Sequence, residues 1–138
     1  MKVAALNQNQ NYQLGLLHFA HLLVMVDGYI DDREKIGITN LLREEQIPDD
    51  VYLNFQKFER LKSERELYER GVALLSACTE DEKLGAIVHL YRLSEIDGHV
   101  HVKEVRLILY SIKATRIEFE DVELAAKLLK AGSHLATA

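Results

Sequence analysis

The sequence predicts an all-α protein: a compact bundle of about seven helices, built as two pseudo-symmetric halves. Three observations predict this fold. Proline occurs once in 138 residues, at Pro48. Apolar residues recur at spacings of three and four, the period of a helix face, and strict alternation is scarce. The sequence also contains an internal repeat: the Asp-Gly pair that ends one apolar run at Asp27-Gly28 occurs again 70 residues later, at Asp97-Gly98.

Size and composition limit the class of protein. A chain of 138 residues, 48% apolar and 28% charged, fits one ordinary globular domain. With 17 basic against 22 acidic residues its net charge is −5, which argues against nucleic-acid binding. The single cysteine, Cys78, forms no internal disulfide. The apolar run 19–26 is much shorter than the ~20 residues of a membrane span, and no signal peptide is visible. We therefore expect a cytoplasmic protein without direct membrane insertion.

The first half is expected to contain an arm and three helices. Residues 1–11 lack an apolar pattern and are expected to form a loose N-terminal arm, before a single domain over 12–138. A helix over 12–26 is apolar on most of its circumference and should be central. A second helix is expected over 32–46. Pro48 follows it, and Asp49 or Asp50 can cap a third helix that ends near residue 61, with Phe55 and Phe58 facing inward.

The second half is expected to contain four helices. Ser63 with Glu66 forms a capping-box pattern at the start of the fourth helix, and Thr79 with Glu82 forms another before a fifth helix that ends near residue 96. A sixth helix is expected over 102–115 and a seventh over 120–131, with Gly132 as the residue that ends it. The repeat halves are then about 12–61 and 79–131.

The repeat extends beyond the Asp-Gly pair. Eight identities fall in the 34 ungapped positions from residue 14 to residue 47: Leu14/Leu84, Gly15/Gly85, Leu23/Leu93, Asp27/Asp97, Gly28/Gly98, Glu34/Glu104, Ile38/Ile108 and Ile47/Ile117. A glycine inside a helix costs about 1 kcal/mol relative to alanine. The matched Gly15 and Gly85 therefore predict a close approach between the two most apolar helices.

The Asp-Gly stretches can be read as structure. Gly28 and Gly98 each follow an apolar helix, where a glycine suits the left-handed conformation that ends it. Asp31 and Glu34 can form a capping box for the next helix. The aspartates fit less easily, because a negative charge is disfavoured at a helix C-terminus. Either Asp27 and Asp97 cap the following helix, or a cation offsets their charge.

The cation alternative gives a candidate metal site. Carboxylates within a short span are hard oxygen ligands suited to calcium or magnesium, and a histidine among them favours zinc or manganese. The candidate ligands of this divalent ion are Asp27, Asp31, Glu34, Asp97, His101 and Glu104. An EF-hand is excluded, because two of the three ligand positions before Gly28 are the apolar Leu23 and Met25.

The stretches DGYIDDRE and DGHVHVKE, each after an apolar helix, resemble the TerB-like (tellurite-resistance protein B) family. The resemblance covers nearly all of the chain after the N-terminal arm. It implies a seven-helix fold with two pseudo-symmetric halves and a bacterial role in stress response, tellurite resistance or protein assembly. It also implies metal binding by Asp27, Asp31, Glu34, Asp97 and Glu104. The sequence departs from the family pattern at His101 and Val102, where further acidic residues are expected, and this weakens a symmetrical two-site arrangement.

The remaining chemistry-bearing residues form no catalytic motif. His18 and His21 lie on the apolar first helix and are expected in the core or at its edge. His89 has no acidic neighbour at helical spacing, and Cys78 is expected to be buried as a small apolar residue.

We therefore expect a non-enzymatic module that binds a protein partner, with a divalent cation at the Asp-Gly junctions; the oligomeric state stays open. The alternative is a metal-dependent hydrolase with Asp27, Glu34, Asp97 and His101 in one site.

Overall fold

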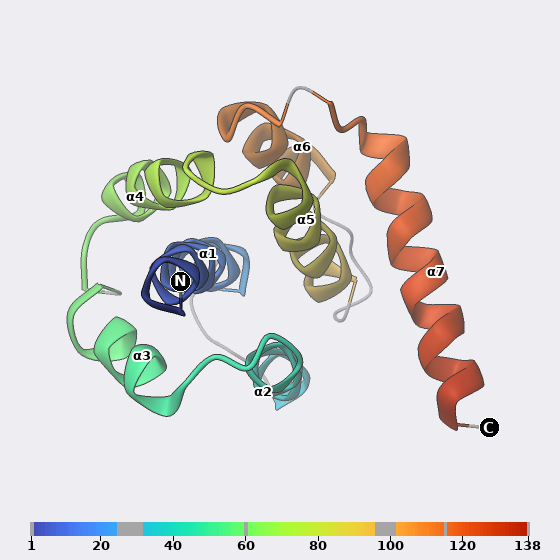
Figure 1. Cartoon of the computed structure of the whole chain (residues 1–138), viewed down its shortest axis with the longest axis horizontal. Coiled ribbons are helices and arrows are strands. Elements are labelled where there is room, and N and C mark those ends of the chain that lie inside the picture. The colour runs from blue at the N-terminus through green and yellow to red at the C-terminus, as the bar shows by residue number, and fades with distance from the viewer. Residues whose placement is uncertain (1, 25–31, 60, 96–101, 115, 138) are drawn as a thin grey trace.

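The computed structural model confirms the all-α fold (Figure 1). It describes residues 2–24, 32–59, 61–95, 102–114 and 116–137. Within these ranges the elements in chain order are α1 (Lys2–Val24), α2 (Asp32–Glu44), α3 (Asp49–Asn54), a π-helical turn (Phe55–Glu59), α4 (Glu64–Ser76), α5 (Glu80–Ser94), α6 (Val102–Ser111) and α7 (Phe119–Thr137). No helix in the described ranges is both long enough and apolar enough to cross a membrane.

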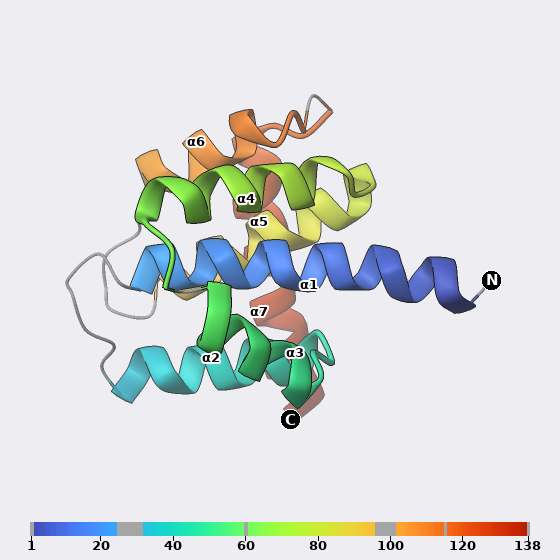
Figure 2. The same ribbon diagram turned by 90° about the vertical axis from the view of Figure 1, so that its left-hand side faces the viewer.

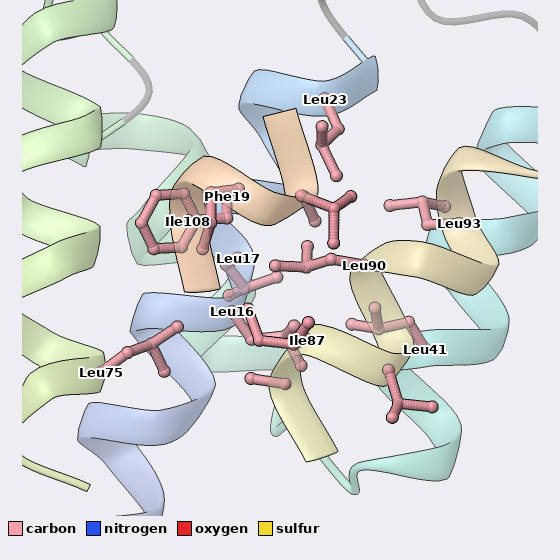
Figure 3. Packing of buried hydrophobic residues seen from close by; sticks show 14 of the residues in the cluster. Leu16, Leu17, Phe19, Leu23, Leu41, Leu75, Ile87, Leu90, Leu93 and Ile108 are labelled. Carbon is pink, nitrogen blue, oxygen red and sulfur yellow. The ribbon is translucent and has the colours of Figure 1, made fainter. Parts of the chain in front are cut away.

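The core is organised around α1. Seen end-on, this helix lies inside an arc formed by α3, α4, α5 and α2 (Figure 1). Its side chains at Leu16, Leu17 and Phe19 are buried and fill the space between α4 and α5. Figure 3 shows Leu16 and Leu17 beside Ile87 and Leu90 of α5. The expectation that the first apolar helix is central is therefore confirmed.

Hydrogen-bonded caps begin α4 and α5 where the sequence predicts them. Thr79 accepts from the Glu82 backbone N–H at 3.1 Å, and the Glu82 carboxylate accepts from the Thr79 backbone N–H at 2.9 Å, so both bonds of a capping box are present. Ser63 accepts from the Glu66 backbone N–H at 3.2 Å, while its own hydroxyl donates to the Glu66 carboxylate. The α4 cap is therefore only half of the predicted box.

The N-terminal segment differs from the expected loose arm, because α1 begins at Lys2 and not at Tyr12. The Asn- and Gln-rich stretch before Tyr12 contains no proline or glycine. A helix that is already nucleated by packed residues extends through such a stretch, since each added residue gains one backbone hydrogen bond. The lack of an apolar pattern before Tyr12 therefore does not indicate the lack of a helix.

The third helix also differs from expectation. It continues beyond Asn54 as the π turn Phe55–Glu59, whose wider winding changes the direction of its side chains. Phe55 is 3% exposed, whereas Phe58, which an α-helix would place on the same face, is 67% exposed. The inward orientation predicted for Phe58 is therefore wrong.

Two helix ends lie at residues other than glycine. Gln46 follows α2 with φ 52° and Lys113 follows α6 with φ 59°, so each takes the left-handed conformation that usually favours glycine. Consequently α6 ends at Ser111, before the expected residue 115. In contrast, Gly132 lies within α7, which continues to Thr137 instead of ending at residue 131.

One pair of helix boundaries agrees with the sequence offset. The starts of α3 and α7, at Asp49 and Phe119, are 70 residues apart. A pseudo-twofold relation between the two halves stays a prediction.

The close approach of α1 and α5 that Gly15 and Gly85 predict is only partly right. A Cβ on Gly85 would lie 3.3 Å from Tyr12 Oη of α1, but a Cβ on Gly15 would lie 2.7 Å from Leu75 Cγ of α4.

Candidate functional site

Most of the predicted metal ligands cannot be placed. Four of the six lie outside the described residues: Asp27, Asp31, Asp97 and His101. Glu34 belongs to α2, although its side chain is also outside the description, and Glu104 is exposed in the first turn of α6. In the described part of the chain, no group of three or more His, Cys, Asp or Glu side chains is arranged to hold a metal ion. The metal site stays a prediction.

The helix ends that flank the Asp-Gly stretches nevertheless share one end of the bundle. Figure 2 shows the C-terminal ends of α1 and α5 and the N-terminal ends of α2 and α6 on the same side of the molecule. The N-terminus of α4 lies there too. This end therefore collects helix termini from both halves of the chain.

A groove lies near this end, between α1, α4 and α6, with a volume of 350 Å³. This volume is at the lower end of the range of ~300–1,000 Å³ that is typical of binding pockets. Its floor is apolar and is formed by side chains from the last turns of α1 and from α4 and α6: Phe19, Leu22, Leu23, Tyr68 and Ile108. Three charged residues stand at its rim: Glu64, Arg65 and Glu104.

A small residue and a hydrogen-bonded tyrosine position the floor. Gly71 of α4 leaves room for Phe19, whose ring atoms would lie 2.9 Å from a Cβ at that position. The Phe19 ring packs edge-on against Tyr68, with 5.5 Å between ring centroids. The Tyr68 hydroxyl is hydrogen-bonded to the Ser111 hydroxyl and lies 3.5 Å from the Leu107 carbonyl. Tyr68 thus links α4 to α6 across the base of the groove.

The rim combines acidic charge with an exposed apolar side chain. Glu64 and Glu104 occupy the first turns of α4 and α6, where the helix dipole stabilises a carboxylate. Arg65 is paired with Glu69 at 2.9 Å, which offsets its positive charge locally. Leu107 remains 56% exposed. The groove is therefore suited to an apolar side chain that is followed by a basic group.

A second cluster, which sequence reasoning missed, joins α1, α2 and α5. His89 of α5 is hydrogen-bonded through Nε2 to Glu45 at the end of α2, and Glu45 also accepts from the Tyr12 hydroxyl of α1. The hydrogen bond from His89 lowers the pKa of Glu45, although burial acts in the opposite direction. Burial, followed by the Glu45 charge, raises the pKa of Tyr12. This chain of hydrogen bonds fixes the end of α2 against the centre of the bundle.

The surroundings of His89 extend this cluster to the surface. Its Nδ1 lies 3.8 Å from Glu44, and Arg92 Nη1 lies 3.4 Å from the same Glu44 oxygen. A cavity of 250 Å³ adjoins these side chains. Glu45 and Glu44 already bind His89 and Arg92, so these polar side chains are satisfied within the protein.

A third cluster surrounds His18, which is fully buried as expected for a core histidine. Its Nδ1 donates to the Leu14 carbonyl at 2.6 Å, and its Nε2 lies 3.3 Å from Glu59 Oε2 on the π turn. Burial lowers the pKa of His18 and outweighs these two acceptors, which favour the protonated ring. Glu59 also binds Lys62 at 2.8 Å and Arg70 at 3.4 Å. Burial alone would raise the pKa of Glu59, but these cationic neighbours and His18 lower it.

The two histidine clusters join helices to one another, whereas the groove presents unsatisfied apolar surface to solvent. The groove is therefore the candidate functional site. No family model, curated protein or solved structure matches the chain, so this assignment rests on the protein's own residues.

Proposed function

We propose that the chain is a non-enzymatic protein-interaction module of the TerB-like kind, and that the groove between α1, α4 and α6 receives a segment of its partner. The observation that carries the proposal is the exposed Leu107 beside an apolar floor with an acidic rim. Buried apolar anchors supply most of the binding energy at protein interfaces, and charged rims contribute to specificity. The expected partner segment presents an apolar side chain followed by a lysine or arginine.

A divalent cation is part of this proposal. Bound by the carboxylates of the Asp-Gly junctions, it would order the end of the bundle next to the groove. The supporting observation is that the helix ends flanking both junctions lie at the same end of the molecule as Glu104 (Figure 2). The TerB-like resemblance adds a bacterial cytoplasmic setting and a role in stress response or tellurite resistance.

The binding proposal is tested by capture of partners on immobilised protein. The wild type is compared with Leu107→Glu, which puts a charge beside the apolar floor, and with Ile36→Glu as a control. Ile36 is a suitable control because it is 61% exposed on α2 and lies outside the groove lining. A partner retained by the wild type and the control but lost by Leu107→Glu supports the proposal. Equal retention by all three proteins would place binding elsewhere.

The metal part is tested by thermal unfolding. EDTA-treated protein is heated with added calcium, magnesium, manganese or zinc, beside an Asp27→Asn/Asp97→Asn variant. A ligand at a hundred times its Kd stabilises the folded state by about 2.7 kcal/mol, which gives a clear rise in Tm. The expected result is a rise for the wild type that the variant lacks. The absence of any rise would leave both aspartates as helix caps.

The alternative of a metal-dependent hydrolase is favoured by the same clustering of helix ends, because it needs Asp27, Asp97, His101 and Glu34 in one place. Hydrolysis of a simple phosphate or carboxylate ester distinguishes the two readings. A manganese- or zinc-dependent rate that Asp97→Asn abolishes would establish the enzyme. The proposed module shows no such rate while its cation-dependent rise in Tm persists.

A further inference from the structure

The last helix has two differently used faces. Val122 and Ala126 of α7 are buried, and α7 packs on α5. On another face Leu124 is 58% exposed and Leu128 is 63% exposed. Figure 1 shows α7 at the outer edge of the molecule. Two leucines spaced by four residues form an apolar stripe on an outer helix.

Charges of opposite sign flank this stripe on one side. At about 100° per residue, Glu120 lies about 40° and Lys127 about 60° around the helix from Leu124, in the same direction. Both side chains are exposed. They stand on opposite sides of Leu124 along the helix axis, with the acidic residue nearer the N-terminus. One edge of the stripe therefore runs from negative to positive charge.

The charges along this edge match those of a second copy of the helix when the two helices are antiparallel. A twofold axis perpendicular to two antiparallel helices brings the same edge of each helix together in opposite directions. If the helices cross at Leu124, Glu120 of each copy meets Lys127 of the other, and the contact forms twice. A parallel pair would instead place Glu120 beside Glu120. We propose that α7 is the interface of a homodimer, in which two copies cross antiparallel at Leu124 with reciprocal Glu120–Lys127 ion pairs.

This interface is separate from the groove proposed for the partner protein. Leu107 belongs to α6 and lines the groove, whereas Leu124 belongs to the outer face of α7. The dimer and the partner-binding function can therefore fail independently of each other. Leu107→Glu is the matched control here, since it introduces the same charge on another exposed leucine.

The first test measures the dimer Kd by sedimentation equilibrium. The wild type and Leu107→Glu are expected to dimerise equally, while Leu124→Glu stays monomeric. Lys127→Glu should raise Kd on the order of tenfold, because the changed pair occurs twice in a symmetric dimer. The charge exchange Glu120→Lys/Lys127→Glu should restore the wild-type value. A monomeric wild type, or an exchange no tighter than Lys127→Glu alone, would overturn the proposal.

The second test is independent of charge. In a Cys78→Ser background, Leu124→Cys places one thiol from each copy close to the twofold axis, within reach of a disulfide. Oxidation of dilute protein should give a covalent dimer, whereas Ile36→Cys on α2 should not. Equal cross-linking of both variants would indicate random collision and contradict the proposed interface. Circular dichroism verifies that each variant is folded.

Discussion

At the scale of single residues, the feature that the sequence did not predict is that the buried His18 has partners on both ring nitrogens. His18 lies between the Leu14 carbonyl and Glu59, and burial keeps its pKa below the ordinary value of 6.5. The folded state therefore holds a ring that resists protonation, while the unfolded chain takes up a proton below about pH 6.5. Protons consequently favour the unfolded state over this range.

This linkage predicts that the protein loses stability as the pH falls from 7 to 5. His18→Leu removes the titrating ring and should show a shallower loss, by at most about 1.4 kcal/mol per pH unit for a single proton. The free energy of unfolding in urea, measured at several pH values for both proteins, gives the comparison. Identical pH profiles would show that His18 takes up its proton equally in the folded and unfolded states, and would contradict this prediction.

The partner of His18 had no signal in the sequence. Histidines at positions 18 and 21 of an apolar helix predict core placement, and His18 confirms this. Glu59, however, is 41 residues away, and Glu45 is 44 residues from His89. Local spacing reports only neighbours on the same helix, whereas these pairs form when separate helices pack. Their identification needed the tertiary structure.

At the scale of helices, local signals were most informative at N-terminal ends. The starts of α4 and α5 follow from Ser63 and Thr79, because a capping side chain satisfies backbone N–H groups within four residues of itself. The C-terminal ends at Gln46 and Lys113 were not predicted, since neither residue usually adopts positive φ. Tertiary packing, rather than local preference, ends α2 and α6.

The two glycines of the repeat are predicted to respond differently to alanine. A Cβ on Gly15 would lie 2.7 Å from Leu75 Cγ, and Leu75 is fully buried and cannot move aside. Overpacking of about 1–3 kcal/mol should exceed the gain of about 1 kcal/mol in helix propensity, so Gly15→Ala lowers stability. Gly85→Ala meets only Tyr12 Oη, at 3.3 Å, and should change stability little.

Urea denaturation followed by circular dichroism gives both values. Gly85→Ala serves as the matched control, because it makes the same substitution at the corresponding position of the repeat. An effect of Gly15→Ala that is as small as that of Gly85→Ala would mean that α1 and α4 can separate slightly at Gly15. That result would make the α1–α4 contact less rigid than the short distance indicates.

At the scale of the whole molecule, Cys78 reports on the integrity of the bundle. It lies in the turn between α4 and α5, and burial raises the pKa of its thiol to about 11. At pH 8 its thiolate is about a hundredfold scarcer than that of a thiol with a pKa of 9, although each thiolate is more nucleophilic. Alkylation of the native protein should therefore be roughly tenfold slower than that of an unperturbed thiol.

The rate of this alkylation should rise with urea along the same curve as the loss of helical circular dichroism, because a single domain of this size unfolds cooperatively. Alkylation that rises at lower urea than the circular dichroism change would reveal separate opening of the α4–α5 turn. Cys78→Ser provides the unreactive baseline for the measurement.

The central position of α1 also affects how the protein is made. This helix leaves the ribosome before α4 and α5, whose side chains cover its apolar surface. Between Val24 at the end of α1 and Ser94 at the end of α5 the ribosome adds 70 residues, which takes about 4–14 s at ~5–20 residues per second. Throughout this interval the nascent chain exposes Leu16, Leu17 and Phe19, which are buried in the folded protein. Translation order thus leaves the apolar surface of the central helix uncovered until α5 has been made.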